Sequence, residues 1–314
     1  MKRIFPLIFC LALLLTGCGK EIKSESTIFA MDTVMTLEVW GEDAENATTQ
    51  LAKRINATER TWSTTQTNSL ISRMNRGEIQ SLAEDEAALV TKVESLAERT
   101  HYAFNPRLRS LSLAWGFYHS ENQDANFELP TESEIAAAIA EAQWDLGAVI
   151  KGYTGQECAD LLSHLDVDRA ILNLGGNTQT YGEKPDGEPW IIGIQNPDGG
   201  DALGLLSVSG TCSIVTSGDY QRYFEKDGMR YHHILDGETG YPAETDLRSV
   251  TVICRDGMTA DALSTALFVM GLEESVEFWR QSNDFEAVFL TKDGKIYATE
   301  GAVLSRCAYE VITR

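Results

Sequence analysis

Three residues, Asp261, Ser264 and Thr265, have side-chain types and a spacing that could bind a metal ion. In a helix they stand at positions i, i+3 and i+4, which places one carboxylate and two hydroxyls on a single face. Their neighbours are mostly apolar, so we expect a largely buried helix in which an ionised carboxylate needs a partner. Hard oxygen ligands on one face suit Mg²⁺ or Ca²⁺. Spacing alone leaves open the alternative that Asp261 is an N-terminal helix cap.

The segment from Asp145 to Tyr153 combines an acidic residue, a glycine-rich bend, Lys151 and an expected helix start. Backbone amides at a helix N-terminus favour anions, so this segment is a candidate cradle for a nucleotide or another anion. It matches neither the P-loop nor the G-x-G-x-x-G fingerprint. A tight turn from strand to helix would also explain the glycines.

Thr216 to Asp219 form a similar segment, which we expect to turn into a helix through Phe224. In that arrangement Ser217 and Gly218 could offer a hydroxyl and backbone amides to a phosphate. An ordinary N-terminal cap is the alternative, and this segment taken alone favours it.

His232 and His233 are neighbours on an expected strand. Successive side chains of a strand point to opposite faces, so only one of the two histidines can face a given site, and Leu235 shares the face of His233. A zinc site made from the adjacent pair is therefore excluded. A single histidine beside a metal-bound phosphate could act as a base or as a phosphate partner.

The chain is strongly acidic, with 26 Lys and Arg against 47 Asp and Glu and a net charge of −21. Nucleic-acid-binding proteins carry basic patches, as do proteins that dock on anionic lipid through their charge, so both classes are disfavoured. An acidic protein that handles phosphates needs a metal ion or backbone amides to do so.

The N-terminus has the features of an export signal, because a short basic start precedes an apolar run over residues 4–15. This run is too short to span a bilayer comfortably. The residues before Cys18 resemble the bacterial lipobox, which implies a signal peptide over residues 1–17 and lipidation of Cys18; cleavage elsewhere is the alternative. Polar residues 18–27 are expected to tether a domain over residues 28–314. We expect an exported lipoprotein anchored at the periplasmic face of the inner membrane.

Four cysteines fall in the expected domain, and they form no C-x-x-C pair, so we expect no zinc site. An exported protein can form disulfides, and four cysteines allow three pairings. Buried free thiols are the alternative, which the apolar surroundings favour for Cys212. The four are Cys158, Cys212, Cys254 and Cys307.

Hydrophobic periodicity predicts strands and helices without a regular βαβ order, so the expected fold class is α+β, with mixed or antiparallel sheets and flanking helices. Lys292-Asp293-Gly294 signals a hairpin turn. Helices are expected over residues 44–61, 84–100, 132–142, 152–165 and 260–270. Strands are expected over residues 33–39, 169–174, 190–194, 229–235, 247–253, 287–290 and 295–298, and in two short runs within 205–215.

Taken together, these segments resemble the ApbE family of FAD:protein FMN transferases, from Met31 to beyond Gly271. Asp145 to Tyr153 matches the family's Asp-Leu-Gly … Lys-Gly-Tyr motif. Asn173 to Asn177 matches Asn-x-Gly-Gly-Asp with asparagine in the last place, and Asp32 replaces the glycine of an opening Met-Gly-Thr. Other matching segments are residues 60–62, 69–75, 104–117, 216–220, 233–240 and 261–265.

The resemblance implies an FAD site in a cleft and a Mg²⁺-dependent transfer of FMN from FAD to a threonine hydroxyl of a target protein, with release of AMP. The acceptor would be a protein such as a subunit of a membrane redox complex. By the same resemblance, His233 would be the acid–base residue. The implied metal ligands are the Asp261 carboxylate, the Thr265 hydroxyl and the Ala148 carbonyl, with Ser264 adjacent. The implied FAD contacts are Met31, Trp62, Leu111, Ser112, Leu113, Asp145, Lys151 and Leu235.

Two other functions would use the same residues. One is a Mg²⁺-dependent FAD pyrophosphatase, in which water replaces the acceptor and the products are FMN and AMP. The other is a flavin-binding lipoprotein without catalytic activity. Trp62 could stack on a flat ring system in any of them, although a plain core tryptophan is the alternative.

Overall fold

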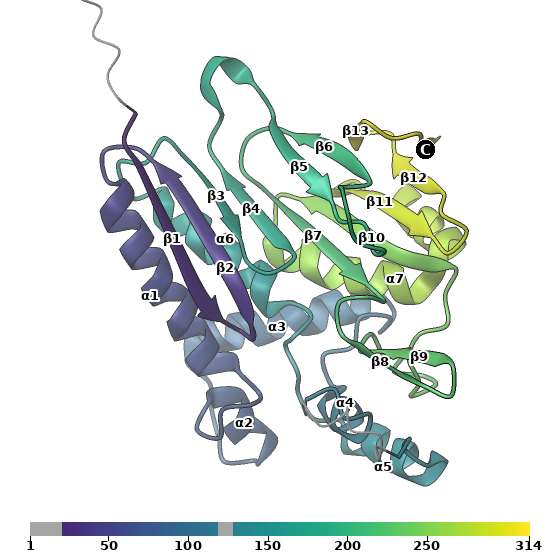
Figure 1. The fold of residues 1–314 in the computed structure, drawn as a ribbon. Helices are drawn as coiled ribbons and strands as arrows, with labels where there is room; N and C mark the ends of the chain where they lie inside the picture. Colours follow the sequence, from purple (N-terminus) through teal and green to yellow (C-terminus); the bar gives the residue numbers. More distant parts are fainter. Residues whose placement is uncertain (1–20, 119–127) are drawn as a thin grey trace, which may run out of the picture.

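A nine-stranded sheet forms the centre of the molecule (Figure 1). The computed structural model describes residues 21–118 and 128–314. Neighbouring strands of the sheet are antiparallel, except that β12 and β14 run parallel. In their order across the sheet, the strands are β1 (Lys23–Ala30), β2 (Thr33–Trp40), β3 (Arg169–Asn173), β4 (Asn177–Tyr181), β7 (Cys212–Gly218), β10 (Leu247–Cys254), β11 (Phe285–Thr291), β12 (Ile296–Thr299) and β14 (Glu310–Ile312).

Two smaller sheets accompany the large one. A three-stranded sheet packs on it through an apolar cluster in which Trp190, Leu206 and Leu304 meet Ile214 and Val288. A separate hairpin makes the other sheet. The three-stranded sheet consists of β5 (Trp190–Ile194), β6 (Gly204–Val208) and β13 (Val303–Ser305). The hairpin consists of β8 (Tyr223–Lys226) and β9 (Met229–His232).

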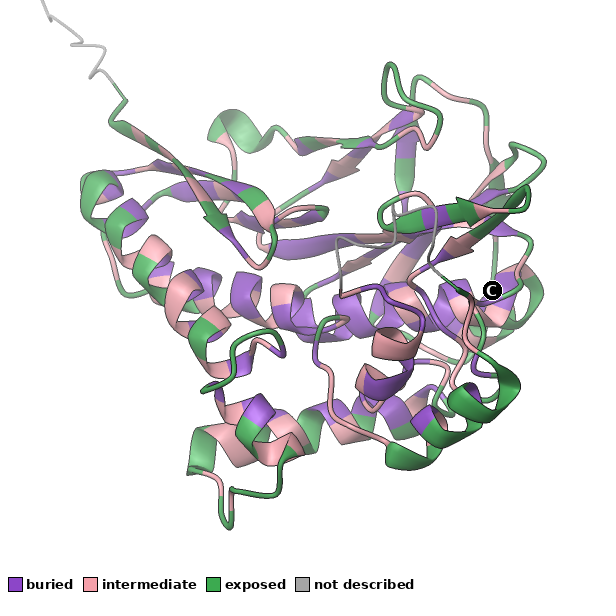
Figure 2. Ribbon diagram, turned by 60° about the horizontal axis from the view of Figure 1, so that its bottom comes forward, coloured by how far each residue is buried: buried purple, intermediate pink, exposed green. Residues whose placement is uncertain are grey.

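Three long helices, α1, α6 and α7, pack against one face of the nine-stranded sheet (Figure 1). Helix α1 buries the side that faces the sheet and exposes its outer side, whereas α7 is buried over most of its first half (Figure 2). This arrangement confirms the predicted α+β class. The helices of the described residues are α1 (Ala44–Trp62), α2 (Leu70–Asn75), α3 (Glu84–Arg99), α4 (Arg109–Ala114), α5 (Glu132–Glu141), α6 (Ile150–Leu162), α7 (Gly257–Arg280) and the short 3₁₀ helix η2 (Pro185–Gly187).

Strand β2 has the alternation that its sequence predicts. Met35, Leu37 and Val39 point into an apolar cluster with Leu51 and Ile55 of α1. Removing such side chains from water contributes roughly 1.5–3 kcal/mol each relative to leaving them exposed. This packing ties the first hairpin to the first helix.

Helix α7 begins earlier than predicted and contains a break. Its N-terminal cap is Asp256, whose side chain accepts a hydrogen bond of 2.8 Å from the Thr259 backbone N–H. The alternative that Asp261 caps this helix is therefore wrong. Gly271 has φ 78°, a conformation that suits glycine, so the predicted end at this residue is confirmed as a break, after which helix resumes to Arg280.

The structure of two segments differs from the prediction. The tether expected over residues 18–27 is wrong for its second half, because Lys23 to Thr27 belong to β1 and pair with β2. The helix expected to follow Thr216 and to run through Phe224 is also wrong. Strand β7 continues to Gly218, since it pairs with β10, and β8 begins at Tyr223.

The cysteines of the described residues are free thiols, so no disulfide joins them. Cys158, Cys212 and Cys254 are buried, and burial raises the pKa of the Cys158 thiol to about 12. The thiol predicted at Cys212 is confirmed. Within residues 21–118 and 128–314, no helix is long and apolar enough to cross a membrane. The expected signal peptide and Cys18 lie outside the described residues.

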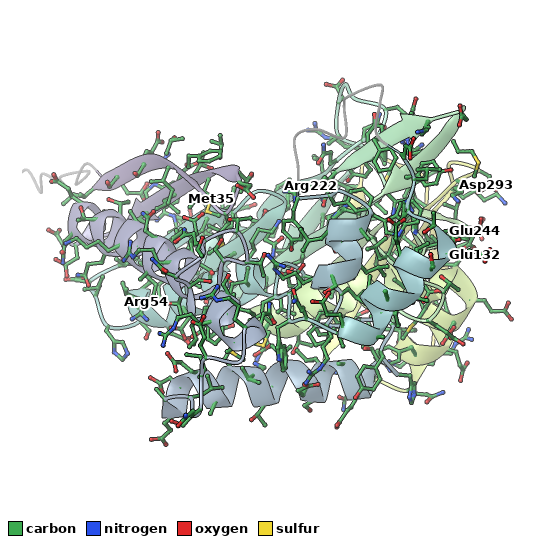
Figure 3. All side chains as sticks on the ribbon, turned by 90° about the horizontal axis from the view of Figure 1, so that it is seen from below. Met35, Arg54, Glu132, Arg222, Glu244 and Asp293 are labelled. Carbon is green, nitrogen blue, oxygen red and sulfur yellow. The ribbon has the colours of Figure 1, made fainter. Side chains whose placement is uncertain are left out.

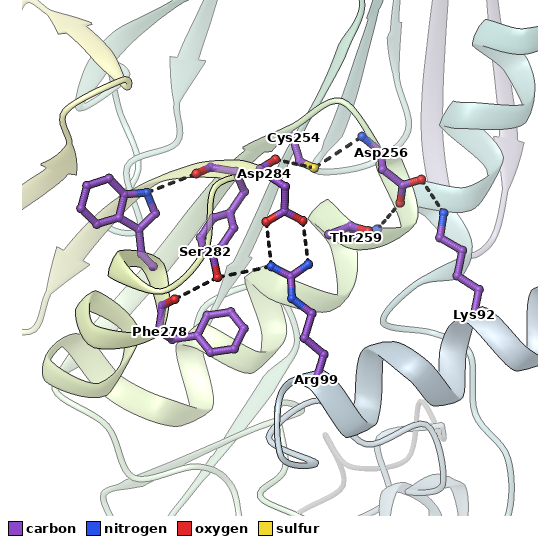
Figure 4. A network of polar contacts seen from close by, with 10 residues as sticks. Lys92, Arg99, Cys254, Asp256, Thr259, Phe278, Ser282 and Asp284 are labelled. Carbon is purple, nitrogen blue, oxygen red and sulfur yellow. Dashed lines mark hydrogen bonds and ion pairs between the residues drawn. The ribbon is translucent and has the colours of Figure 1, made fainter. Parts of the chain in front are cut away.

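A polar network joins α3 to both ends of the α7 region (Figure 4). Arg99 donates two hydrogen bonds of 2.7 Å to the Asp284 carboxylate, and Lys92 pairs with Asp256. The Arg99 side chain holds the pKa of Asp284 below its usual range, against the effect of partial burial. These partly exposed pairs contribute modestly to stability, about 1 kcal/mol or less each. These two contacts connect α3 to both ends of α7, the helix that carries Asp261.

Candidate active site

A cavity of about 560 Å³ opens beside the N-terminus of α6 and the first half of α7. The turns between β1 and β2 and between β3 and β4, together with the segment after β9, complete its wall. Its volume is in the range of small-molecule and cofactor sites. Ten of the thirteen residues implied as acid–base residue, FAD contacts or metal ligands line it: Met31, Trp62, Ser112, Asp145, Ala148, Lys151, His233, Leu235, Asp261 and Thr265.

Asp261 is buried at the junction of α6 and α7, with an exposed fraction of 4%. Its Oδ2 accepts a hydrogen bond of 2.7 Å from the backbone N–H of Gly152. Burial raises the pKa of this carboxyl, and the Lys151 ammonium and the Gly152 amide act in the opposite direction. A carboxylate with this degree of burial gains from a nearby cation.

The close contact of α6 and α7 depends on two glycines. A Cβ atom on Gly152 would lie 2.0 Å from the Gly257 carbonyl oxygen and 2.7 Å from the Asp261 Cβ. A Cβ on Gly257 would lie 2.2 Å from the Gly152 carbonyl oxygen. Only glycine lets the two backbones come this close, and the approach brings the α6 amide within reach of Asp261.

We expect Gly152→Ala to lower the free energy of unfolding by about 3 kcal/mol, because the added methyl must separate two packed backbones. The matched control is Gly155→Ala in the same helix, whose Cβ would meet side chains and no backbone atom, with Gln179 at 3.3 Å and Leu174 at 3.5 Å. That control should change the free energy of unfolding by less than about 1 kcal/mol. Chemical denaturation of both variants measures the difference, and equal stabilities would contradict the close-contact argument.

Ala148 and Asp145 lie in the turn that precedes α6. Asp145 Oδ1 accepts a hydrogen bond of 2.9 Å from the Gly147 backbone N–H, and its other oxygen accepts one from the Tyr118 hydroxyl. Among the described residues, no hydrogen-bond donor reaches the Ala148 carbonyl. Asp145 therefore orients this turn, and the Ala148 carbonyl is available to a ligand.

The hydroxyl groups beside Asp261 form a small cluster with β7. Ser217 Oγ lies 2.8 Å from Ser264 Oγ and 3.3 Å from Thr265 Oγ1. Ser264 also donates a hydrogen bond of 2.8 Å to the Asp261 carbonyl. Ser217 reaches this cluster from a strand, so the predicted anion site at a helix N-terminus is wrong for residues 216–219.

Two cationic side chains, Lys151 and Arg222, line the cavity. Lys151 Nζ donates a hydrogen bond of 3.1 Å to the Gly175 carbonyl oxygen in the turn between β3 and β4. Seen from below, Arg222 lies between the β1–β2 hairpin and the region of α4 and α5 (Figure 3). The two positive charges make the cavity suitable for an anion in an otherwise acidic protein.

His233 follows the end of β9 and lines the cavity, whereas His232 is buried against Phe268. The prediction that only one of the two histidines faces the site is confirmed. His233 Nδ1 lies 3.1 Å from the Arg222 carbonyl oxygen. A carbonyl only accepts, so Nδ1 carries the hydrogen and Nε2 keeps its lone pair. Burial and the Arg222 guanidinium lower the pKa of His233 to about 3, which keeps the imidazole neutral.

The β1–β2 turn reaches the cavity through Met31. The Met31 backbone N–H donates a hydrogen bond of 2.8 Å to Glu59 Oε1, and both Met31 and Asp32 have positive φ values, 51° and 57°. A two-residue hairpin turn of type I′ has this conformation at both central positions, and aspartate tolerates it. Trp62 belongs to an apolar cluster and also lines the cavity, so its role as a core residue is confirmed, and stacking on a flat ring stays a prediction.

Three predicted residues do not line the cavity. Leu111 is fully buried in an apolar cluster with Trp115 and Phe117, and Leu113, on the same short helix, is not part of the cavity wall. Ser264 is fully buried beneath Thr265 and Ser217. Of the segment from 111 to 113, only Ser112 faces the cavity.

The cavity also has residues that were not singled out in the sequence, among them Glu59, Tyr118 and Arg222. They lie far apart along the chain, and no local pattern marks them. Asn177, one of the two departures from the family motifs, lines the cavity beside Asp261. Among residues 21–118 and 128–314, no group of three or more His, Cys, Asp or Glu side chains is placed to hold a metal ion.

Comparison with known proteins agrees with this architecture. Residues 31–289 match the ApbE family. A protein of Treponema pallidum named FAD:protein FMN transferase is 35% identical over 246 residues, which cover 69% of this chain and 68% of that protein. A protein of the same name from Klebsiella pneumoniae is 45% identical over 154 residues, but these cover only 48% of this chain and 46% of that protein. This match therefore spans about half of the Klebsiella protein.

A solved structure has the same fold. The crystal structure of the ApbE protein from Thermotoga maritima superposes with a TM-score of 0.81 at 28% identity, covering 89% of this chain and 98% of that one. The match in sequence spans the elements that build the cavity, from the β1–β2 turn to β11. The chain belongs to the ApbE family.

Proposed function

We propose that this protein is a Mg²⁺-dependent FAD:protein FMN transferase, which moves FMN from FAD onto a threonine hydroxyl of an acceptor protein and releases AMP. The observation that carries the proposal is the convergence on one cavity of the oxygen atoms of Asp261, Thr265 and Ala148, the ammonium of Lys151 and the imidazole of His233. Membership of the ApbE family and the names of its relatives support the same activity.

The donor atoms fit a magnesium ion. Asp261 uses Oδ2 for Gly152 and has Oδ1 left, the Ala148 carbonyl accepts no hydrogen bond among the described residues, and the Thr265 hydroxyl lines the same cavity. All three are hard oxygen ligands, and Mg²⁺ completes such a set with substrate phosphates and water. When bound there, Mg²⁺ would neutralise the diphosphate charge and polarise a phosphoryl oxygen.

The remaining residues orient the substrate. Lys151 and Arg222 bring positive charge to the diphosphate, and Trp62 offers an aromatic surface to a flat ring. Asp145 holds the turn that presents the Ala148 carbonyl, since both of its oxygens already accept hydrogen bonds within the protein. Asp145 is therefore a positioning residue for the cation site.

The transfer is a single displacement at phosphorus. The acceptor oxygen forms a bond to the phosphorus of the FMN part, the bond from this phosphorus to the bridging oxygen breaks, and AMP leaves with that oxygen and its electron pair. The proton of the acceptor hydroxyl goes to Nε2 of His233, which the Nδ1 contact with Arg222 leaves unprotonated. No nucleophile from this chain is needed.

The test is transfer by the full chain. The protein is incubated with FAD, Mg²⁺ and a membrane extract from its source cells, and covalent flavin fluorescence is read on a denaturing gel. The labelled protein is then digested, and mass spectrometry locates FMN on a threonine. No labelled band, together with release of FMN and AMP from FAD alone, would instead identify a pyrophosphatase. FAD binding without turnover would identify a flavin-binding protein.

We further propose that Cys18 carries the lipid that anchors the domain at the periplasmic face of the inner membrane, where a subunit of a membrane redox complex is the acceptor. The first strand begins at Lys23, so few residues separate it from the anchor. We expect Cys18→Ser to move the protein from the membrane to the soluble fraction, measured by fractionation and immunoblotting. Retention of that variant in the membrane would contradict lipidation at Cys18.

A further inference from the structure

Two apolar side chains are exposed next to the cavity. Phe29 on β1 and Val34 on β2 are 70% and 59% exposed, and they face each other across the hairpin. The residues between them, Met31 to Thr33, line the cavity. The exposed pair therefore borders the cavity mouth. Contiguous exposed apolar surface marks binding sites, whereas apolar side chains scattered singly are normal on a protein surface.

The hairpin that carries this pair is held in place. Besides the hydrogen bond from Met31 to Glu59, Thr33 packs against the β3–β4 turn so closely that a Cβ on Gly175 would lie 2.3 Å from the Thr33 side chain. The side chains of Phe29 and Val34 are thus presented on a fixed backbone. A fixed apolar surface loses little conformational entropy when it binds a partner.

A second exposed ring follows another cavity residue in the chain. Tyr223 is 44% exposed and directly follows Arg222, which lines the cavity. The guanidinium of Arg230 stacks 4.1 Å from the Tyr223 ring centre. The neighbouring Gln221 reaches the β3–β4 turn, where a Cβ on Gly176 would lie 3.4 Å from its side-chain nitrogen. The two hairpins thus flank one turn at the cavity mouth.

We propose that Phe29, Val34 and Tyr223 are the docking surface for the acceptor protein. The inference rests on the proposed function, because transfer to a protein requires a polypeptide to cross the cavity mouth while its hydroxyl reaches inside. The segment that fits is one with apolar side chains on both sides of the reactive residue. Their burial against these three side chains would hold the segment across the mouth.

The position of the pair along β1 argues for a protein rather than a lipid surface. A strand rises about 3.3 Å per residue, so Phe29 lies about 20 Å from Lys23, where the strand begins. The proposed lipid anchor precedes Lys23, at the opposite end of the strand from the cavity. The exposed pair therefore lies away from the anchored end.

The test compares two double variants of the full chain. Phe29→Thr with Val34→Thr should lower kcat/KM for the acceptor at least tenfold through a higher KM, while quenching of flavin fluorescence reports an unchanged Kd for FAD. The control, Ile191→Thr with Val311→Thr, replaces side chains that are 48% and 55% exposed on other strands, and it should keep kcat/KM unchanged. Tyr223→Ser should also lower kcat/KM for the acceptor. The acceptor is the purified protein that wild-type enzyme labels in the transfer test.

Several results would overturn the docking surface. An unchanged kcat/KM for the Phe29 and Val34 variant, or an equal loss in the control, would exclude these side chains from acceptor binding. A weaker Kd for FAD would place them in the flavin site instead. Lost binding to vesicles of anionic phospholipid with an unchanged kcat/KM would identify a membrane contact. If the wild type labels no protein, the proposed function itself fails, and the docking surface fails with it.

Discussion

Asp261→Asn should lower kcat/KM for FMN transfer by about three orders of magnitude, because the variant loses the one charged ligand of the proposed cation site. Asparagine keeps an oxygen that can accept the hydrogen bond from the Gly152 amide. The fold should therefore persist, whereas Asp261→Ala would leave that buried amide without a partner, at a cost of about 1–3 kcal/mol. Steady-state kinetics at varied Mg²⁺ concentration measures the effect.

Thermal stability gives a readout of this variant that does not depend on activity. Burial raises the pKa of the Asp261 carboxyl, so the charged form is costly without a cation, and the Asn variant should be at least as stable as the wild type in the absence of Mg²⁺. Adding Mg²⁺ should raise the Tm of the wild type and leave that of Asp261→Asn unchanged. The matched control is Asp256→Asn, at the N-cap of the same helix, where asparagine caps the helix equally well. A Mg²⁺-dependent Tm shift in Asp261→Asn would contradict the assignment of the ligand.

His233→Asn should lower kcat for transfer by about 10²–10⁴-fold, since it removes the Nε2 base. The asparagine amide can still donate to the Arg222 carbonyl, as His233 Nδ1 does at 3.1 Å, so the local fold should be kept. FAD should bind to the variant with a similar Kd. The control is His164→Asn, an exposed histidine at the end of α6, which should retain full activity. Transfer at the wild-type rate by His233→Asn would exclude the base role.

The lowered pKa of His233 also has consequences for pH dependence. The folded imidazole titrates at about 3, below the ordinary value of 6.5, so kcat/KM for FAD should show no acidic limb centred near 6.5. In the unfolded chain the same group takes up a proton as the pH falls through 6.5. Acidification from about 6.5 to 3 therefore favours unfolding, and it should destabilise the wild type more than His233→Asn. Urea denaturation at several pH values checks this difference.

Local periodicity predicted the elements whose pattern does not depend on distant partners. Met35, Leu37 and Val39 alternate because a strand exposes and buries successive side chains, and β2 has that pattern. The helical spacing of Asp261 and Thr265 likewise placed both residues on the cavity side of α7. Such patterns are fixed by backbone geometry, with periods of 2 and 3.6 residues.

Pairing with distant strands decided the segments that were predicted wrongly. Residues 216–218 have turn-forming side chains, yet they extend β7 because Ser249 of β10 pairs with Gly218. Polar residues Lys23 to Thr27 join the sheet because β2 supplies the hydrogen-bond partners that a solvated tether would lack. In both segments the ladder of a neighbouring strand outweighs local propensity, which is weak for strands.

The same distinction between local patterns and distant contacts applies to the candidate site. The sequence by itself determined the residue types: a carboxylate and two hydroxyls at helical spacing, a lysine before a helix and one usable histidine of an adjacent pair. Only the tertiary structure decided that Ser264 turns to Ser217 inside the protein, that Leu111 joins a core cluster, and that Arg222 reaches the cavity. The physical reason is distance along the chain. Asp261 receives its hydrogen bond from Gly152, 109 residues earlier, and that contact exists only because two glycines allow α6 and α7 to touch.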